Sequence, residues 1–132
     1  MNMYKFVKFE GRNARMEDRI TVTKSKSIGF PTKFYKDNNI QNFKYVVLFY
    51  DQEKKAIAIK FTNDIVEKNK FAIIKSTQGY GGSVVAQSFF KSLGIDAEKY
   101  ANRYNWEKTN IEGIGEIYVI NLIEKLKSAN DS

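Results

Sequence analysis

The stretch ITVTKSKSIGFPTKFYKDNNI at residues 20–40 resembles a later one, FAIIKSTQGYGGSVVAQSFFKSLGI, at residues 71–95. Their last ten residues align without a gap at an offset of 55 positions. Aromatic residues match at two adjacent places, and Lys36 and Ile40 match Lys91 and Ile95. Each stretch also contains a β-branched run that ends in Lys-Ser. We interpret the two stretches as related strand-helix-strand units, which makes an internal repeat the main organising feature of the chain.

Each unit continues into a predicted hairpin. The runs YVVLFY (45–50) and AIAIKF (56–61) flank a short charged link, and residues 106–109 and 116–123 flank a glycine-containing turn. We therefore expect an α+β fold, a single domain of antiparallel hairpins with two short helices and an approximate internal repeat over about residues 20–61 and 71–123. Residues 1–61 would form a basic N-terminal half and residues 71–123 the C-terminal half. The polar linker 62–70 is too short to separate independent domains, and residues 124–132 would be a frayed tail.

Local signals predict where the helices begin and end. Pro31 suits the first turn of a helix, and Asn38-Asn39 suits a left-handed exit that Gly94 provides in the second unit. We expect the second helix to begin at Ser83 as its N-cap and to pack through a set of mainly apolar side chains. That set is Val84, Val85, Ser88, Phe89 and Leu93. A further helical turn capped by Asp96 and an edge strand at residues 4–9 complete the prediction.

Two absent residue types exclude much chemistry. The chain has no Cys, so disulfides, thiolate nucleophiles and Cys-ligated metals are excluded, and it has no His, the commonest general base and metal ligand. Glu107, Glu112 and Glu116 could meet across a hairpin, but no neighbouring residue indicates a catalytic environment. We expect a protein that is not an enzyme and has no metal or cofactor. No signal peptide or membrane span is evident, so we expect a cytoplasmic protein without a membrane partner.

The net charge of +7 lies entirely in the first half of the chain. Residues 1–60 hold 13 basic and 6 acidic residues, whereas residues 61–132 hold 9 of each. Lys and Arg supply most of the sequence-independent affinity for phosphate polymers, so one interpretation is a nucleic-acid-binding face. The other is ordinary solubility. The candidate face comprises the cations around the first strand-turn-helix: Arg12, Arg15, Arg19, Lys24, Lys26, Lys33 and Lys36.

A glycine loop is the second candidate site for an anion or a base. Its residues are Gly79, Tyr80, Gly81, Gly82 and Ser83. We expect the loop to lead directly onto a helix N-terminus, where exposed backbone N–H groups favour an anion, and the tyrosine could stack on a base. The spacing matches neither a P-loop nor a dinucleotide-binding fingerprint. A tight turn that lets two backbones approach closely is the alternative interpretation.

The order of elements in residues 20–61 resembles the swapped-hairpin unit of the AbrB/MraZ type. Ile28-Gly29-Phe30-Pro31 stands at the apolar-Pro step of that family, Asn39-Ile40 at the end of its helix, and residues 45–61 at its hairpin. The resemblance implies a duplex-DNA-binding regulator of transcription that acts as a dimer or tandem repeat. It places Arg19, Lys24, Lys26 and Lys33 toward DNA. The chain departs from the pattern in its serine-containing turn and in its glycine-rich second copy.

A weaker resemblance is to PC4-like and Whirly-like single-strand binders, which use a curved sheet with basic and aromatic residues. On that resemblance the surface would be the hairpin at residues 45–61, with Lys44, Tyr45 and Lys60. We expect a non-enzymatic nucleic-acid-binding protein that prefers duplex DNA slightly over single strands and is compatible with a homodimer. The alternatives are a single-stranded DNA or RNA binder and an accessory module that binds an acidic protein partner.

Overall fold

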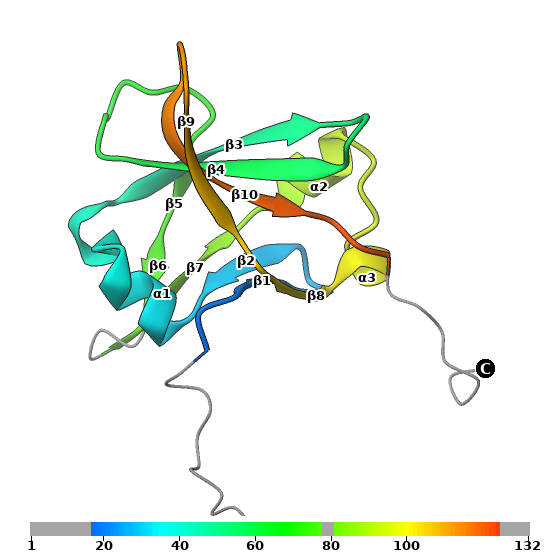
Figure 1. The fold of residues 1–132 in the computed structure, drawn as a ribbon, viewed down its shortest axis with the longest axis horizontal. Coiled ribbons are helices and arrows are strands. Elements are labelled where there is room, and N and C mark those ends of the chain that lie inside the picture. Colours follow the sequence, from blue (N-terminus) through cyan, green and yellow to red (C-terminus); the bar gives the residue numbers. More distant parts are fainter. Residues whose placement is uncertain (1–16, 78–80, 125–132) are drawn as a thin grey trace, which may run out of the picture.

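Two antiparallel five-stranded sheets lie face to face in this computed structural model, which describes residues 17–77 and 81–124 (Figure 1). Sheet A has the strand order β6-β7-β2-β1-β8, and sheet B has the order β5-β3-β4-β10-β9. The bounds in sheet A are β1 Ile20–Val22, β2 Ser27–Phe30, β6 Ile74–Lys75, β7 Gly82–Val85 and β8 Asn102–Tyr104. Those in sheet B are β3 Tyr45–Asp51, β4 Ala56–Thr62, β5 Phe71–Ala72, β9 Glu107–Ile111 and β10 Gly115–Asn121.

Continuous chain joins the two sheets at both edges. Only Ile73 separates β5 at the edge of sheet B from β6 at the edge of sheet A, and only Asn105 and Trp106 separate β8 from β9 at the opposite edges. The two sheets therefore form one barrel-like body, in which each edge strand continues along the chain into an edge strand of the other sheet.

Short helices pack at opposite ends of this body (Figure 1). The helices are α1 Thr32–Asp37, α2 Gln87–Ser92 and α3 Ala97–Tyr100, and the 3-10 turn η2 spans Ile40–Asn42. The ring of Phe34 in α1 lies between the sheets, 5.8 Å from Phe30 of sheet A and 5.1 Å from Tyr118 of sheet B. At the other end Phe89 of α2 lies 6.3 Å from Tyr50. The buried side chains of the described residues are all apolar or aromatic.

The internal repeat predicted from the sequence is visible in the hydrogen bonding. Helices α1 and α2, and strands β2 and β7, are each offset by 55 positions. Tyr35 N donates to Pro31 O, and 55 positions later Phe90 N donates to Ala86 O. The paired strands β2 with β7 and β4 with β10 run antiparallel at the centres of their sheets, as an approximate two-fold axis requires. The predicted α+β class and the approximate internal repeat are confirmed.

The predicted left-handed exits of α1 and α2 and the predicted N-cap of α3 are also confirmed. Asn39 has φ of 56° and Gly94 has φ of 66°, so both exits are left-handed. The Asp96 side chain accepts hydrogen bonds from the backbone N–H groups of Glu98 and Lys99, which makes it the N-cap of α3. The edge strand predicted at residues 4–9 lies outside the described residues.

The predicted start of the second helix is wrong. Ser83, Val84 and Val85 belong to β7, which pairs with β2 in the register Gly29↔Ser83 and Ile28↔Val84. Helix α2 begins at Gln87 after Ala86, so Ser83 does not cap it. Val84 is fully buried and Val85 is 49% exposed, which is the alternation of a strand, and Leu93 at the helix end is 43% exposed.

Candidate nucleic-acid interface

A row of side chains crosses the outer side of sheet A, with small residues at its centre and Arg103 and Ile74 at its two ends. The pairings Thr21↔Arg103, Thr21↔Gly29, Gly29↔Ser83 and Ile74↔Ser83 place one residue from each of the five strands side by side. Paired residues point to the same face of a sheet, and the neighbours Ile28, Val22 and Val84 point into the core. Ser27 and Val85 form the next pair on the same side. We call the surface formed by all these residues the sheet A outer face. Its members are Thr21, Ser27, Gly29, Ile74, Ser83, Val85 and Arg103.

This face is open and slightly hollowed. A shallow depression of about 470 Å³ lies over it, and its lining includes Thr21, Gly29, Ile74 and Ser83. The exposed fractions of Ile74 and Val85 are 55% and 49%, so no described helix covers them. None of the strand residues of sheet A is acidic, whereas sheet B carries acids within its strands. The outer face of sheet A is therefore uncovered, and its strands carry no acid.

Lys24 and Lys26 lie in the turn between β1 and β2, at the end of sheet A next to α2. The position is fixed because Ala86 N donates to Lys26 O at 2.9 Å. Lys26 has φ of 68°, a conformation that L-residues adopt rarely, and the turn is closed by hydrogen bonds around the Thr23 hydroxyl, which lies 2.9 Å from Ser25 Oγ. Neither ammonium forms an ion pair with another described residue, so both charges are available to a ligand.

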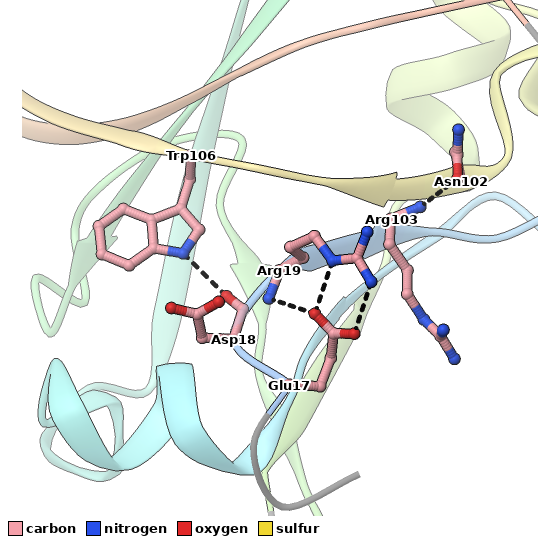
Figure 2. Close-up of polar contacts among 6 residues, drawn as sticks. All are labelled: Glu17, Asp18, Arg19, Asn102, Arg103 and Trp106. Carbon is pink, nitrogen blue, oxygen red and sulfur yellow. Dashed lines mark hydrogen bonds and ion pairs between the residues drawn. The ribbon is translucent and has the colours of Figure 1, made fainter. Parts of the chain in front are cut away.

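Arg19 is engaged by an acid of its own segment. Its Nε and Nη2 donate to the Glu17 carboxylate at 2.8 and 2.9 Å, and its backbone N donates to the same carboxylate (Figure 2). The side-chain hydrogen bond from Arg19 is the largest cause that lowers the pKa of Glu17 to about 2, and the nearby charge of Arg103 contributes. The Arg19 side chain is 43% exposed. Part of the Arg19 side chain is therefore open to solvent, but its charge is already offset by Glu17.

Arg103 is a cation of this face that sequence reasoning missed. It lies on β8, directly opposite Thr21 of β1, and it is exposed. In Figure 2 its side chain extends away from the Glu17–Arg19 pair, and no ion pair joins it to another described residue. The contact between β1 and β8 joins residues about 80 positions apart. No local pattern in the sequence signals such a pairing.

The remaining predicted cations do not join this face. Lys33 and Lys36 lie on α1, at the opposite end of the barrel from the β1–β2 turn. Lys33 Nζ lies 2.7 Å from Asp37 Oδ2, and this hydrogen bond is the largest cause that raises the pKa of Lys33. Arg12 and Arg15 lie outside the described residues. The seven predicted cations are therefore divided between two ends of the molecule and a segment that the structure does not describe.

The glycine loop leads into a strand, so the expected help from a helix N-terminus is absent. Gly82 and Ser83 belong to β7, and Gly79 and Tyr80 lie outside the described residues. Gly81 has φ of 119°, and a Cβ placed there would lie 2.6 Å from Phe30 O. A close approach of two backbones, the alternative interpretation from the sequence, accounts for this glycine. The depression over the sheet A outer face is lined partly by Gly81, Gly82 and Ser83, so contact with a ligand stays a prediction.

The alternative surface on sheet B is more apolar. Tyr45 and Lys60 share its outer face, because Tyr45 pairs with Thr62 and Val47 pairs with Lys60. The Tyr45 ring is already occupied on one side by Lys70 Nζ, 5.0 Å from the ring centroid. The adjacent Lys44 is exposed, and its backbone N donates to Asn63 Oδ1. Aromatic and basic side chains are therefore present together here, whereas the described part of the sheet A outer face has no aromatic ring.

Neither a metal centre nor a membrane span is found among the described residues. No group of three or more Asp or Glu side chains is arranged to hold a metal ion in residues 17–77 and 81–124. Glu116 instead lies 3.6 Å from the ammonium of Lys108. Within the same ranges no helix has the length and apolar character needed to cross a bilayer. No protein-family model, curated protein or solved structure matches this chain.

Proposed function

We propose that this protein binds nucleic acid, with duplex DNA preferred, through the sheet A outer face and the β1–β2 turn. The observation that supports the proposal most strongly is the combination of an uncovered face, whose strands carry no acid, with three cations at its rim that form no ion pair with another described residue, namely Lys24, Lys26 and Arg103. Thr21, Ser27 and Ser83 offer short hydroxyl groups that suit phosphate contacts. Such contacts would hold a duplex backbone without requiring the insertion of a base.

The absence of aromatic rings from the described part of this face favours a duplex over a single strand. Single-strand binders gain much of their affinity from bases that stack on aromatic side chains. Tyr45 and Phe49 provide such rings on sheet B, where Phe49 pairs with Ala58 and is only half-buried. The outer face of sheet B would be favoured if the protein bound single strands more tightly than duplex DNA. Substitutions at Lys60 and Tyr45, rather than in the β1–β2 turn, would then abolish binding. The resemblance to swapped-hairpin DNA-binding proteins agrees with the duplex alternative, and a role in transcriptional regulation belongs to the same proposal.

Salt dependence is the first test. Fluorescence anisotropy with labelled duplex DNA, single-stranded DNA and RNA is measured over a series of salt concentrations. Three cations in contact with phosphates, namely Lys24, Lys26 and Arg103, would make log K fall with log salt with a slope of about −2.7 on duplex DNA. Binding of an acidic protein partner, without binding to any of the three oligonucleotides at low salt, would contradict the proposal and favour the accessory-module alternative.

A pair of matched variants locates the contact. The double substitution Lys24→Glu with Lys26→Glu should reduce duplex affinity by about tenfold or more and make the slope less steep by about 1.8, because two phosphate contacts are lost. Lys54→Glu with Lys68→Glu changes the net charge equally, but at exposed loop positions beside sheet B strands. Equal losses in the two double variants would mean that net charge alone governs binding and that the sheet A outer face has no special role.

A further inference from the structure

A second hollow lies at the α1 end of the barrel, away from the sheet A outer face. This cleft has a volume of about 450 Å³, within the range of small-molecule sites. One wall is the segment that contains Asn38, Asn39, Asn42 and Phe43, which follows α1 and includes the end of η2. The other wall comes from β4, β9 and β10. Its residues are Lys60, Phe61, Lys108, Glu116 and Tyr118.

Aromatic rings form the base of the cleft. Phe61 and Tyr118 are buried, and their ring centroids lie 5.4 Å apart in an edge-to-face arrangement. Phe43 lies 5.9 Å from Phe61 and is only half-buried. Tyr118 Oη donates to Asn38 Oδ1 at 3.2 Å, and Asn38 Nδ2 donates to Phe34 O, so this tyrosine and this amide are held in place. A flat ring could pack against such a base with little rearrangement of the protein.

Amide groups line the mouth. The side chains of Asn39 and Asn42 make no hydrogen bond to another described residue, so their donors and acceptors are free for a ligand. Asn39 is held in the left-handed conformation, and Asn42 O accepts a hydrogen bond from Asn63 Nδ2 at 2.7 Å, so the backbone that carries both amides is fixed. Each amide offers two donors and one acceptor oxygen, which suits a partner that presents both kinds of group on one edge.

Two of the three charged residues that line the cleft form an ion pair with each other. Lys108 Nζ lies 3.6 Å from the Glu116 carboxylate and 5.6 Å from the Tyr118 ring centroid. Lys60 pairs with Val47, whereas its neighbour Phe61 pairs with Val46 and points inward, so the Lys60 side chain belongs to the opposite face of sheet B. A ligand at this cleft therefore meets a neutral ion pair rather than an excess of positive charge, which disfavours a phosphate group.

We infer that the cleft binds a neutral planar heterocycle with hydrogen-bond donors and acceptors on its edge, the chemistry of a nucleobase or nucleoside. The ring lies against the half-buried Phe43, with Phe61 and Tyr118 offering only their small exposed parts beneath it, and the amides of Asn39 and Asn42 contact its polar edge. The site is separate from the sheet A outer face, and the inference does not depend on the proposed nucleic-acid binding.

The test is a ¹⁵N NMR titration of the full chain with adenosine, guanosine, cytidine and uridine, and with the corresponding monophosphates. At least one nucleoside should shift the amide signals of Asn38, Asn42 and Tyr118 with a Kd of about 1 mM or tighter. Its monophosphate should bind no more tightly. The absence of shifts with all four nucleosides, or binding of a monophosphate that is about tenfold tighter, would overturn the inference.

Three variants separate a built site from a general surface effect. Asn42→Ala and Asn39→Gly should each weaken nucleoside binding by about tenfold, since each removes an amide at the mouth. Glycine adopts the positive φ of Asn39 without strain, so this variant preserves the fold. Asn69→Gly is the matched control, because Asn69 has a φ of 60° but lies in the loop between β4 and β5 and does not line the cleft. Equal affinities in all three variants and the wild type would overturn the inference.

Discussion

Lys26 and Gly81 show how single residues set the two hairpin turns that meet the helices. They are 55 positions apart and both have positive φ, 68° and 119°. The turn that holds Lys26 lies beside Ala86, whose N–H donates to the lysine carbonyl. Pro31 is the residue of the first unit that corresponds to Ala86, and it has no N–H to donate. The backbone at Gly81 lies so close to the Phe30 carbonyl oxygen that only a glycine fits there.

The close backbone approach at Gly81 predicts that an alanine there lowers the free energy of unfolding more than an alanine at Gly94, where the surrounding space is open. Gly94→Ala should lower the free energy of unfolding by about 1 kcal/mol, because φ is 66° but no atom lies within 4 Å of the added Cβ. Gly81→Ala should cost about 3 kcal/mol or more, because the Cβ would lie 2.6 Å from the Phe30 carbonyl oxygen. Urea denaturation of both variants measures the two values. Equal costs would show that the close approach between the β6–β7 turn and the start of α1 is not present in solution.

Glu17 gives a pH dependence at the same scale. Its pKa in the folded protein is lowered to about 2, chiefly by the Arg19 hydrogen bond, from an ordinary value of 4.5. A lowered carboxylate pKa contributes stability that is present above pH 4.5 and is lost as the pH falls toward 2. Because Arg19 is 43% exposed, we expect the contribution to stay below about 1 kcal/mol. Urea midpoints should fall less between pH 4.5 and pH 2 in Glu17→Gln than in the wild type, and parallel profiles would contradict the assignment.

At the scale of elements, local signals were sufficient where the backbone conformation is decided by neighbouring residues. Pro31, Asn39, Gly94 and Asp96 mark helix ends because their φ angles or side-chain acceptors act within one turn. Strand β7 was missed because the run GSVV ahead of QSFF also matches a helical period, and its pairing with β2 decides the outcome. The pairing of β8 with β1, which brings Arg103 to the candidate interface, is equally non-local.

The reassigned boundary of α2 can be tested by substitution. Ser83→Ala should change the free energy of unfolding by no more than about 0.5 kcal/mol, because Ser83 lies on an open sheet face rather than at a helix N-cap. A true N-cap would cost about 1 kcal/mol or more. Phe34→Ala provides the reference for a buried helix residue and should cost about 3–5 kcal/mol, since its ring packs between the sheets. If Ser83→Ala lowered the free energy of unfolding as much as the loss of an N-cap does, the helix would begin at Ser83, as the sequence predicted, and not at Gln87.

At the scale of the whole molecule, the two-fold arrangement of backbone is not matched by charge. The first hairpin turn carries Lys24 and Lys26, whereas the corresponding residues 79–81 are Gly-Tyr-Gly. The first-half excess of positive charge was evident in the sequence, but its division among the β1–β2 turn, α1 and the N-terminal residues depends on how the repeat folds back on itself. Part of the candidate site was therefore predictable, namely Lys24 and Lys26, whereas its uncovered floor, the pairing of Arg19 with Glu17 and the position of Arg103 were not.

The most direct measurement of the central claim is a ¹⁵N NMR titration of the intact chain with a short duplex at low salt. We predict that the largest shifts fall on Thr21, Lys24, Lys26, Gly29 and Ser83, with little change at Tyr45 and Lys60. Shifts confined to sheet B, or no shifts at any described residue, would contradict nucleic-acid binding at the sheet A outer face.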